Sequence, residues 1–162
     1  MAELPPAGAL PGQLSTARGR VALGLLCSAF LVDVMGATSV FTASPAIGQA
    51  LHLTAAGLQW TIIAATLPAG ALLLAGGRLA DLLGPRRMFL TGLSLLLAAS
   101  LGCGLAPDAA VLIAARAAQG AAGALLMPAA LSLVIRTFDG QAGQRAALAA
   151  WSATGGIGAT AG

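Results

Sequence analysis

Charged residues are scarce in this chain of 162 residues, where they make up 8% against 58% for hydrophobic residues. A soluble domain needs roughly 25% charged residues to cover its surface, and a small globule leaves much of that surface in water. With a mean hydropathy of +0.91, most of the chain must lie in lipid. We therefore expect an integral membrane protein.

Cysteine and histidine are also few. Cys27 and Cys103 lie within apolar runs, and His52 is the only histidine. Without a CxxC pair or Cys/His spacing, we expect no metal, no cofactor, and cysteines that pack as small apolar side chains. The Ser/His/Asp or metal groups of an intramembrane hydrolase are missing too. We therefore predict no catalytic residue and no enzyme activity.

Lysine is absent, so all eight basic residues are arginines, and the sequence pI is about 10.2. A nucleic-acid-binding protein gathers its basic residues on one face. Here the arginines instead separate apolar runs. We therefore expect no nucleic-acid partner.

Long apolar runs dominate what is present. A helix needs about 20 apolar residues to cross a bilayer core of about 30 Å. Five stretches qualify or nearly qualify. The first is followed by Asp33 and a further apolar stretch rather than by a cleavage site, so we interpret it as an uncleaved first span. The predicted spans are about Val21–Thr42, Leu58–Gly76, Phe89–Ala106, Ala109–Ile135 and Ala146–Gly162. This pattern predicts an all-α, polytopic helical bundle, preceded by a disordered tail over residues 1–20.

The arginines predict the topology. Apart from Arg116 within the fourth span, they lie before the first span, between the second and third, and between the fourth and fifth, whereas the other two connections contain no Arg. Cytoplasmic loops retain Lys and Arg, so we expect a multi-pass protein of the cell (inner or plasma) membrane with a cytoplasmic N-terminus. Residues 146–162 reach only about 25 Å at 1.5 Å per residue. We therefore expect the chain to be a fragment of a longer protein.

Two spans carry charged residues. Asp33 is the only carboxylate inside an apolar span, and the fourth span places Arg116, Gln119, Gly120 and Gly123 on one helix face. A charge at this depth must face protein or water. Counting helical rise puts Asp33 and Arg116 at similar depths. We expect both to face one cavity and interact, forming a proton and substrate pathway with Gln119, while Gly120 and Gly123 allow close helix packing. The alternatives are a structural arginine and a carboxylate satisfied at a helix junction.

The segment GRLADLLGPRR, residues 77–87, connects the second and third spans. Glycine permits a tight turn, proline stops helix continuation, and Asp81 can pair with Arg86 or Arg87. The segment resembles the signature loop of the major facilitator superfamily, G-x-L-A-D-x-x-G-R-[KR]. The matching residues are Gly77, Leu79, Ala80, Asp81, Gly84 and Arg86.

Further motifs follow in family order. Residues 116–123 resemble the helix-four motif R-x-x-Q-G, and Leu58–Trp60 resemble the L-Q-W that opens helix two. The helix-one motif D-x-T-I-V-N-V-A-L-P, of the fourteen-helix drug/proton antiporter branch, matches at Thr38, Ala43 and Pro45. Its Asp position falls on Gly36, one turn after Asp33. Gly158 and Gly162 resemble the opening of the antiporter motif G-x-x-x-G-P and are predicted helix-packing residues.

The resemblance implies a partial major facilitator fold: the N-terminal fragment of a proton-coupled small-molecule or multidrug efflux transporter, inactive alone. Asp81, Arg86 and Arg87, with Gly77 and Gly84, would form a gating loop. The implied partners are drug-like substrates (often hydrophobic cations), protons, the lipid bilayer and the rest of the transporter. The alternative is a short polytopic interaction or assembly subunit without transport activity.

Overall fold

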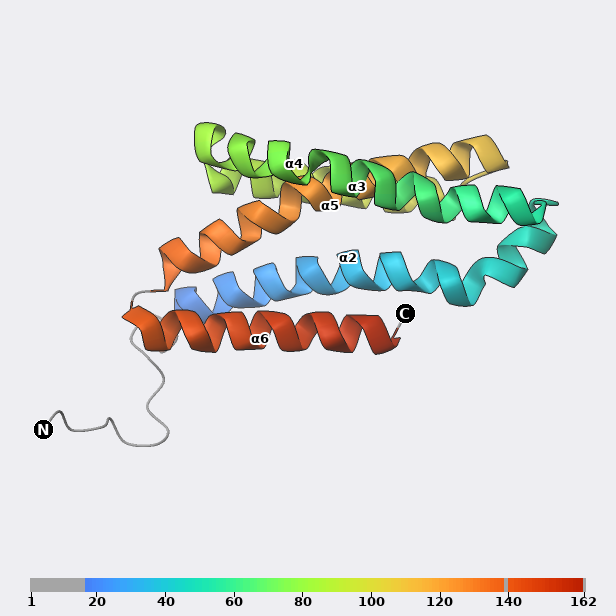
Figure 1. Cartoon of the computed structure of the whole chain (residues 1–162). Coiled ribbons are helices and arrows are strands. Elements are labelled where there is room, and N and C mark those ends of the chain that lie inside the picture. Colours follow the sequence, from blue (N-terminus) through green and yellow to red (C-terminus); the bar gives the residue numbers. More distant parts are fainter. Residues whose placement is uncertain (1–16, 139, 162) are drawn as a thin grey trace, which may run out of the picture.

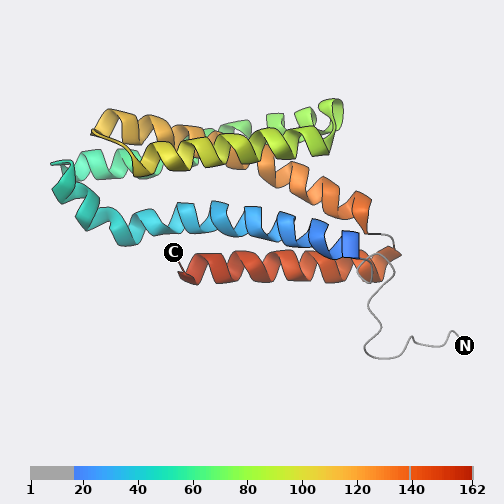
Figure 2. The same cartoon turned by 180° about the vertical axis from the view of Figure 1, so that it is seen from behind.

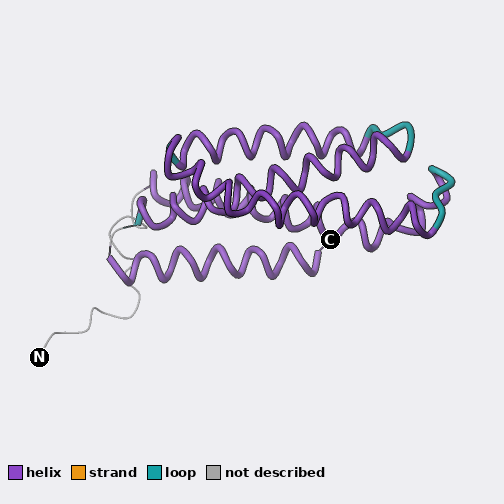
Figure 3. Tube along the Cα trace, turned by 45° about the horizontal axis from the view of Figure 1, so that its top comes forward, coloured by secondary structure: helices purple, strands orange, loops and turns teal. Residues whose placement is uncertain are grey.

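The computed structural model describes residues 17–138 and 140–161, which form five α-helices and no strand. Short connections join the helices (Figure 3). The helices are α2 (Ala17–Ala50), α3 (Ala55–Leu83), α4 (Pro85–Gly104), α5 (Ala109–Thr137) and α6 (Gly140–Ala161) (Figure 1). The predicted all-α class is confirmed. By length and composition, α2 to α5 can each cross a membrane.

The helices and the predicted spans differ mainly at their ends. Most of the tail predicted over residues 1–20 lies outside the described residues, but residues 17–20 already belong to α2. α2 continues through Pro45 to Ala50, eight residues past the predicted end of the first span. α4 ends at Gly104, two residues before the predicted end of the third span. Apolar run length predicts that a helix can cross the bilayer, but it does not predict the residue at which the helix ends.

Local chemistry sets the helix starts. The Thr54 side chain accepts a hydrogen bond from Gly57 N at 3.2 Å and caps α3. The Asp108 carboxylate accepts one from Val111 N at 2.9 Å and caps α5. Both residues are good N-caps because a side-chain oxygen satisfies a free backbone N–H.

The connection between α3 and α4 is a single residue, Gly84. Its φ of 90° is a conformation that side chains rarely adopt, and Pro85 then occupies the first turn of α4. The turn predicted for residues 77–87 is therefore much shorter than that segment. Gly77 and Asp81 lie in the last turns of α3, and Arg86 and Arg87 lie in the first turn of α4.

The helices form two groups. α5 packs against both α3 and α4, whereas α6 packs mainly against α2. Figures 1 and 2 show α2 and α6 side by side, apart from the group of three. The α2–α6 pair contacts the other group far less than α3, α4 and α5 contact one another, and somewhat less than α2 and α6 contact each other.

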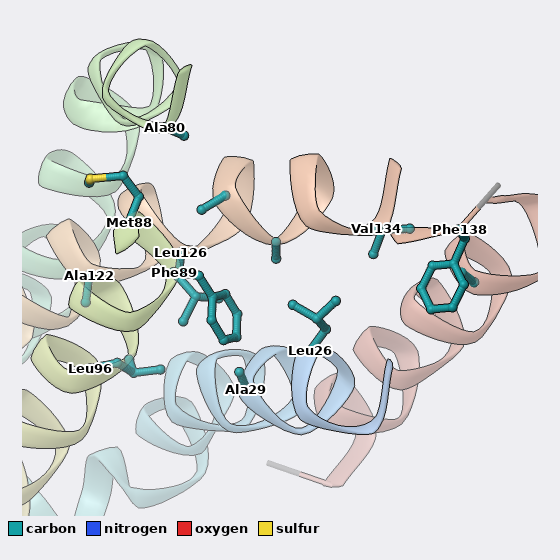
Figure 4. Packing of buried hydrophobic residues seen from close by; sticks show 13 residues of the cluster. Leu26, Ala29, Ala80, Met88, Phe89, Leu96, Ala122, Leu126, Val134 and Phe138 are labelled. Atoms are coloured by element: carbon teal, nitrogen blue, oxygen red, sulfur yellow. The ribbon is translucent and has the colours of Figure 1, made fainter. Parts of the chain in front are cut away.

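A buried apolar cluster joins the two groups toward the end of the bundle where α2 begins (Figure 4). Its members come from all five helices: Leu26, Ala29, Ala80, Met88, Phe89, Leu96, Ala122, Leu126, Ala129, Ala130, Val134, Phe138 and Ala147. Leu26 and Ala29 of α2 lie opposite Phe89 of α4 and Leu126 of α5. The cluster therefore holds α2 against the group of three at one end.

Large apolar side chains outside this cluster remain exposed. Leu74 is 83% exposed, Leu82 is 81% exposed and Leu67 is 67% exposed, all on α3. In water, such a surface would lose about 25 cal/mol for each Å² left unburied. In a bilayer the same side chains meet lipid tails of like polarity, so this surface fits the membrane environment expected from the composition.

Glycines set the distance between α3 and α5. A Cβ added at Gly120 of α5 would collide with the carbonyl oxygen of Ala65, and one at Gly76 of α3 would collide with that of Ala124. Only hydrogen atoms fit at these two points. The sequence predicted Gly120 as a packing residue but singled out Gly77, in the loop motif, rather than Gly76. An added Cβ at Gly77 would lie 4.0 Å from Pro128.

Candidate functional site

A cavity of about 370 Å³ lies between α2 and the group of three helices. Its walls are mostly small apolar residues, among them Ala37, Ala65 and Ala69. All three predicted pathway residues, Asp33, Arg116 and Gln119, line it together with Gly120 and Gly123. The structure thus brings the charged residues of the first and fourth spans into one space.

Arg116 is almost fully buried, with 7% of its surface exposed. Its Nη1 donates a hydrogen bond to the carbonyl oxygen of Gly36 at 2.8 Å, which ties α5 to α2. Its Nε is buried and has no hydrogen-bond partner among the described residues. The guanidinium therefore holds two helices together and still has N–H donors to offer.

Asp33 lies one turn before Gly36 on α2 and is half-buried. A Cβ at Gly123 would lie 3.2 Å from Asp33 Oδ1, so the missing side chain at Gly123 gives the carboxylate its room. The predicted partner of Arg116 on α2 was the Asp33 side chain, but the hydrogen bond goes to the α2 backbone. The described bond of Arg116 goes to Gly36 O, at the position where the family motif has its Asp, and the carboxylate lies farther along the same cavity wall.

Gln119 belongs to a small polar network between α4 and α5. Its Nε2 donates to Ser100 Oγ at 2.9 Å, and its Oε1 accepts from Cys103 Sγ at 3.4 Å. The sequence predicted that Cys103 packs as a small apolar side chain, and the structure adds that its thiol is one of the two partners of the amide. Ser100 and Cys103 were missed as network members, although two polar side chains three residues apart share one helix face.

The predicted gating residues lie away from the cavity, at the α3–α4 turn. The side chains of Asp81, Arg86 and Arg87 are exposed there. They share that end of the bundle with the start of α2 and the junction of α5 and α6, where Arg20, Arg136 and Arg145 lie on the adjoining helices (Figure 1). All connections that the sequence marks with arginine thus lie at one end.

Gly158, one of the two predicted packing glycines of the fifth span, packs against α2. A Cβ at Gly158 would lie 3.2 Å from Val34 Cβ and 3.3 Å from Leu31 O. Thr38 Oγ1 also donates to Gly158 O at 3.4 Å. Gly162 lies outside the described residues.

Metal binding finds no support in the part of the chain that the structure describes. Within residues 17–138 and 140–161, no three His, Cys, Asp or Glu side chains gather into a group that could hold an ion.

Comparison with known proteins gives a consistent result. The Major Facilitator Superfamily matches residues 25–162. The chain is 42% identical to the cephamycin export protein of Amycolatopsis lactamdurans over 123 residues, covering 76% of this chain and 25% of that protein.

Two further relatives are resistance proteins. The lincomycin resistance protein of Streptomyces lincolnensis is 45% identical over 114 residues, covering 70% of this chain and 23% of that protein. The puromycin resistance protein pur8 of Streptomyces alboniger is 37% identical over 167 aligned positions, covering all of this chain and 33% of that protein. The chain spans about a quarter to a third of the length of these relatives.

Proposed function

Because the chain belongs to the major facilitator superfamily, we propose that it is the N-terminal part of a proton-coupled exporter of small, drug-like molecules. The three relatives named above are an export protein and two resistance proteins, which supports this choice among transporter types. The five helices would belong to the first of the two helical bundles of that transporter. The chain alone transports nothing, because alternating access needs a second bundle to move against this one.

The observation that carries the proposal is the cavity between α2, α3 and α5. It gathers Asp33, Arg116 and Gln119 within otherwise apolar walls. Transporters of this kind place substrate and ion sites near the middle of the bilayer, between their helical repeats. Ionisable residues inside membrane spans mark such pathways. Asp33 is the group proposed to exchange the proton.

The topology belongs to the same proposal. Arginines mark one end of the bundle, and the positive-inside rule assigns that end to the cytoplasm of a cell membrane. The exposed charges of Asp81, Arg86 and Arg87 would then meet the second bundle at the cytoplasmic side and act as a gate contact.

The test is proton-driven drug uptake by everted membrane vesicles that contain the full-length protein. Asp33→Asn removes the carboxylate and should abolish uptake driven by a proton gradient. Asp108→Asn is the matched control, since asparagine also caps a helix and Asp108 lies at the α5 N-terminus, outside the cavity. Unchanged proton-driven uptake in Asp33→Asn would show that the proton pathway is wrongly assigned.

A further inference from the structure

The Arg116 guanidinium has donors that the described residues do not use. Arginine carries five N–H donors and no acceptor. Among the described residues, the guanidinium donates one hydrogen bond, from Nη1 to Gly36 O. Its Nε is buried and has no partner there. A buried donor left unpaired is unfavourable, and more so when it is charged. A ligand with acceptor oxygens would relieve this.

The other polar groups around the cavity do not supply those acceptors. The Gln119 amide is bonded to Ser100 and Cys103 on α4. The Thr66 hydroxyl donates to carbonyl groups of its own helix at 3.3 Å. The Asp33 carboxylate lies against Gly123, one turn from the carbonyl that Arg116 binds. Arg116 therefore lines the cavity with its Nε unpaired among the described residues.

The cavity limits what such a ligand can be. Its volume of about 370 Å³ lies in the lower part of the range of about 300–1,000 Å³ that holds small ligands. Ala65, Ala69, Leu73 and Met127 supply apolar walls. A guanidinium binds a planar carboxylate through two parallel hydrogen bonds. The fitting class is therefore a compact apolar molecule that carries a carboxylate.

We propose that Arg116 is a substrate-binding residue that binds the carboxylate of an apolar organic acid, and that such acids are the substrate class of the exporter. This inference rests on the proposed function and narrows it. It departs from the hydrophobic cations that the family resemblance implies. Asp33 faces the same cavity, so its negative charge opposes the bound acid, and neutralising Asp33 strengthens binding.

The experiment is equilibrium dialysis of the 162-residue chain in lipid nanodiscs, with empty nanodiscs to subtract partition into lipid. The probes are 2-naphthoate, methyl 2-naphthoate and 2-naphthylmethylammonium, which share one ring system and differ in charge. The unaltered chain should bind the carboxylate about tenfold more tightly than the ester or the ammonium. Equal binding of acid and ester, or saturable binding of the ammonium alone, would overturn the proposal.

Two variants locate the site. Arg116→Gln should weaken naphthoate binding about tenfold or more, whereas Arg136→Gln makes the same change at an exposed position and should leave it unaltered. Asp33→Asn should bind naphthoate several-fold more tightly. The Asp33→Asn variant retains Arg116, so it tests the proposal even if Arg116→Gln does not fold. Weaker binding in Asp33→Asn, or full binding in a folded Arg116→Gln, contradicts the proposal.

The binding experiment and the uptake experiment test the acid site and the transport function separately. Naphthoate binding to the chain without proton-driven uptake by the full-length protein would refute transport and leave the acid site standing. Uptake of drugs by the full-length protein without any acid binding would refute the acid site alone.

Discussion

At the scale of single residues, the contact between α3 and α5 depends on two missing side chains. Gly120→Ala and Gly76→Ala would each push a methyl group into a backbone carbonyl, of Ala65 and of Ala124 respectively. Overpacking of this kind lowers stability by about 1–3 kcal/mol. We expect that loss in the free energy of unfolding of the purified chain in detergent.

Gly156→Ala on α6 is the control for these two variants, because a Cβ there would meet nothing within 4 Å. Alanine also has a higher helix propensity than glycine, so this variant should be at least as stable as the unaltered chain. A destabilised Gly156→Ala together with neutral Gly76→Ala and Gly120→Ala would contradict the packing described.

The carbonyl beside Gly76 has a particular reason to accept a close neighbour. Pro128 has no backbone N–H, so it cannot bond to Ala124 O four residues earlier in α5. Gly76 lies directly against that oxygen. A Cα–H group can then approach a carbonyl that its own helix leaves unpaired. This pairing was hidden from sequence reasoning, because Gly76 lies outside the loop motif and Gly77 inside it.

The Gln119 network gives a second prediction at this scale. Cys103→Ser keeps a donor for Gln119 Oε1, whereas Cys103→Val removes it and leaves a partly buried acceptor unpaired. Such a loss costs about 1–3 kcal/mol. Thermal unfolding in detergent should show the valine variant below the serine variant. The reverse order would mean that Cys103 serves as an apolar packing residue after all.

At the scale of helices, α6 and α2 form a pair with close contacts along much of their length. Phe30 and Trp151 stack with ring centroids 4.3 Å apart, and Gly158 lies against Leu31 and Val34. An added Cβ at residue 158 would lie 3.2 Å from Val34 Cβ, within a few tenths of an ångström of the roughly 3.5–4.5 Å that disulfides require.

This geometry predicts a disulfide between Val34→Cys and Gly158→Cys, with the native cysteines replaced by Cys27→Ala and Cys103→Ser. After mild oxidation in membranes, a maleimide–polyethylene glycol label should no longer shift the protein on a gel. The pair Val34→Cys and Gly156→Cys should stay labelled, since a side chain at residue 156 points into open space. Equal labelling of both pairs would show that α6 does not pack on α2 through this face.

The sequence predicts the presence of the helices better than it predicts which helices contact each other. Apolar run length predicts that a span exists, and polar residues at matched depth placed Asp33 and Arg116 at one cavity. Which helices touch is a different question, because helices that are apolar all round carry no stripe that marks the buried face. Gly36 shows the same limit: its carbonyl binds Arg116, yet any residue in that place has a carbonyl.

At the scale of the whole molecule, the ends of the bundle differ in charge. The start of α2, the α3–α4 turn and the α5–α6 junction carry arginines at one end, and Asp108 lies at the start of α5 at the other (Figure 1). In the same cysteine-replaced background, Asp108→Cys should react with an impermeant maleimide in intact cells. Arg86→Cys should react only after the membrane is opened. Labelling of both from the same side would refute the topology.

The connection between α3 and α4 leaves these two helices little freedom to move relative to each other. α3 and α4 are joined by Gly84 alone, and Pro85 begins the next helix at once. A connection of one residue has a single pair of backbone dihedral angles. With φ held near 90°, it cannot adjust to a movement of either helix. Any rocking that moves the end of α3 is passed to α4 without delay, and α5 follows because it packs on both. We therefore expect α3, α4 and α5 to move together as one rigid body. The movement would occur at their interface with α2, which has fewer contacts.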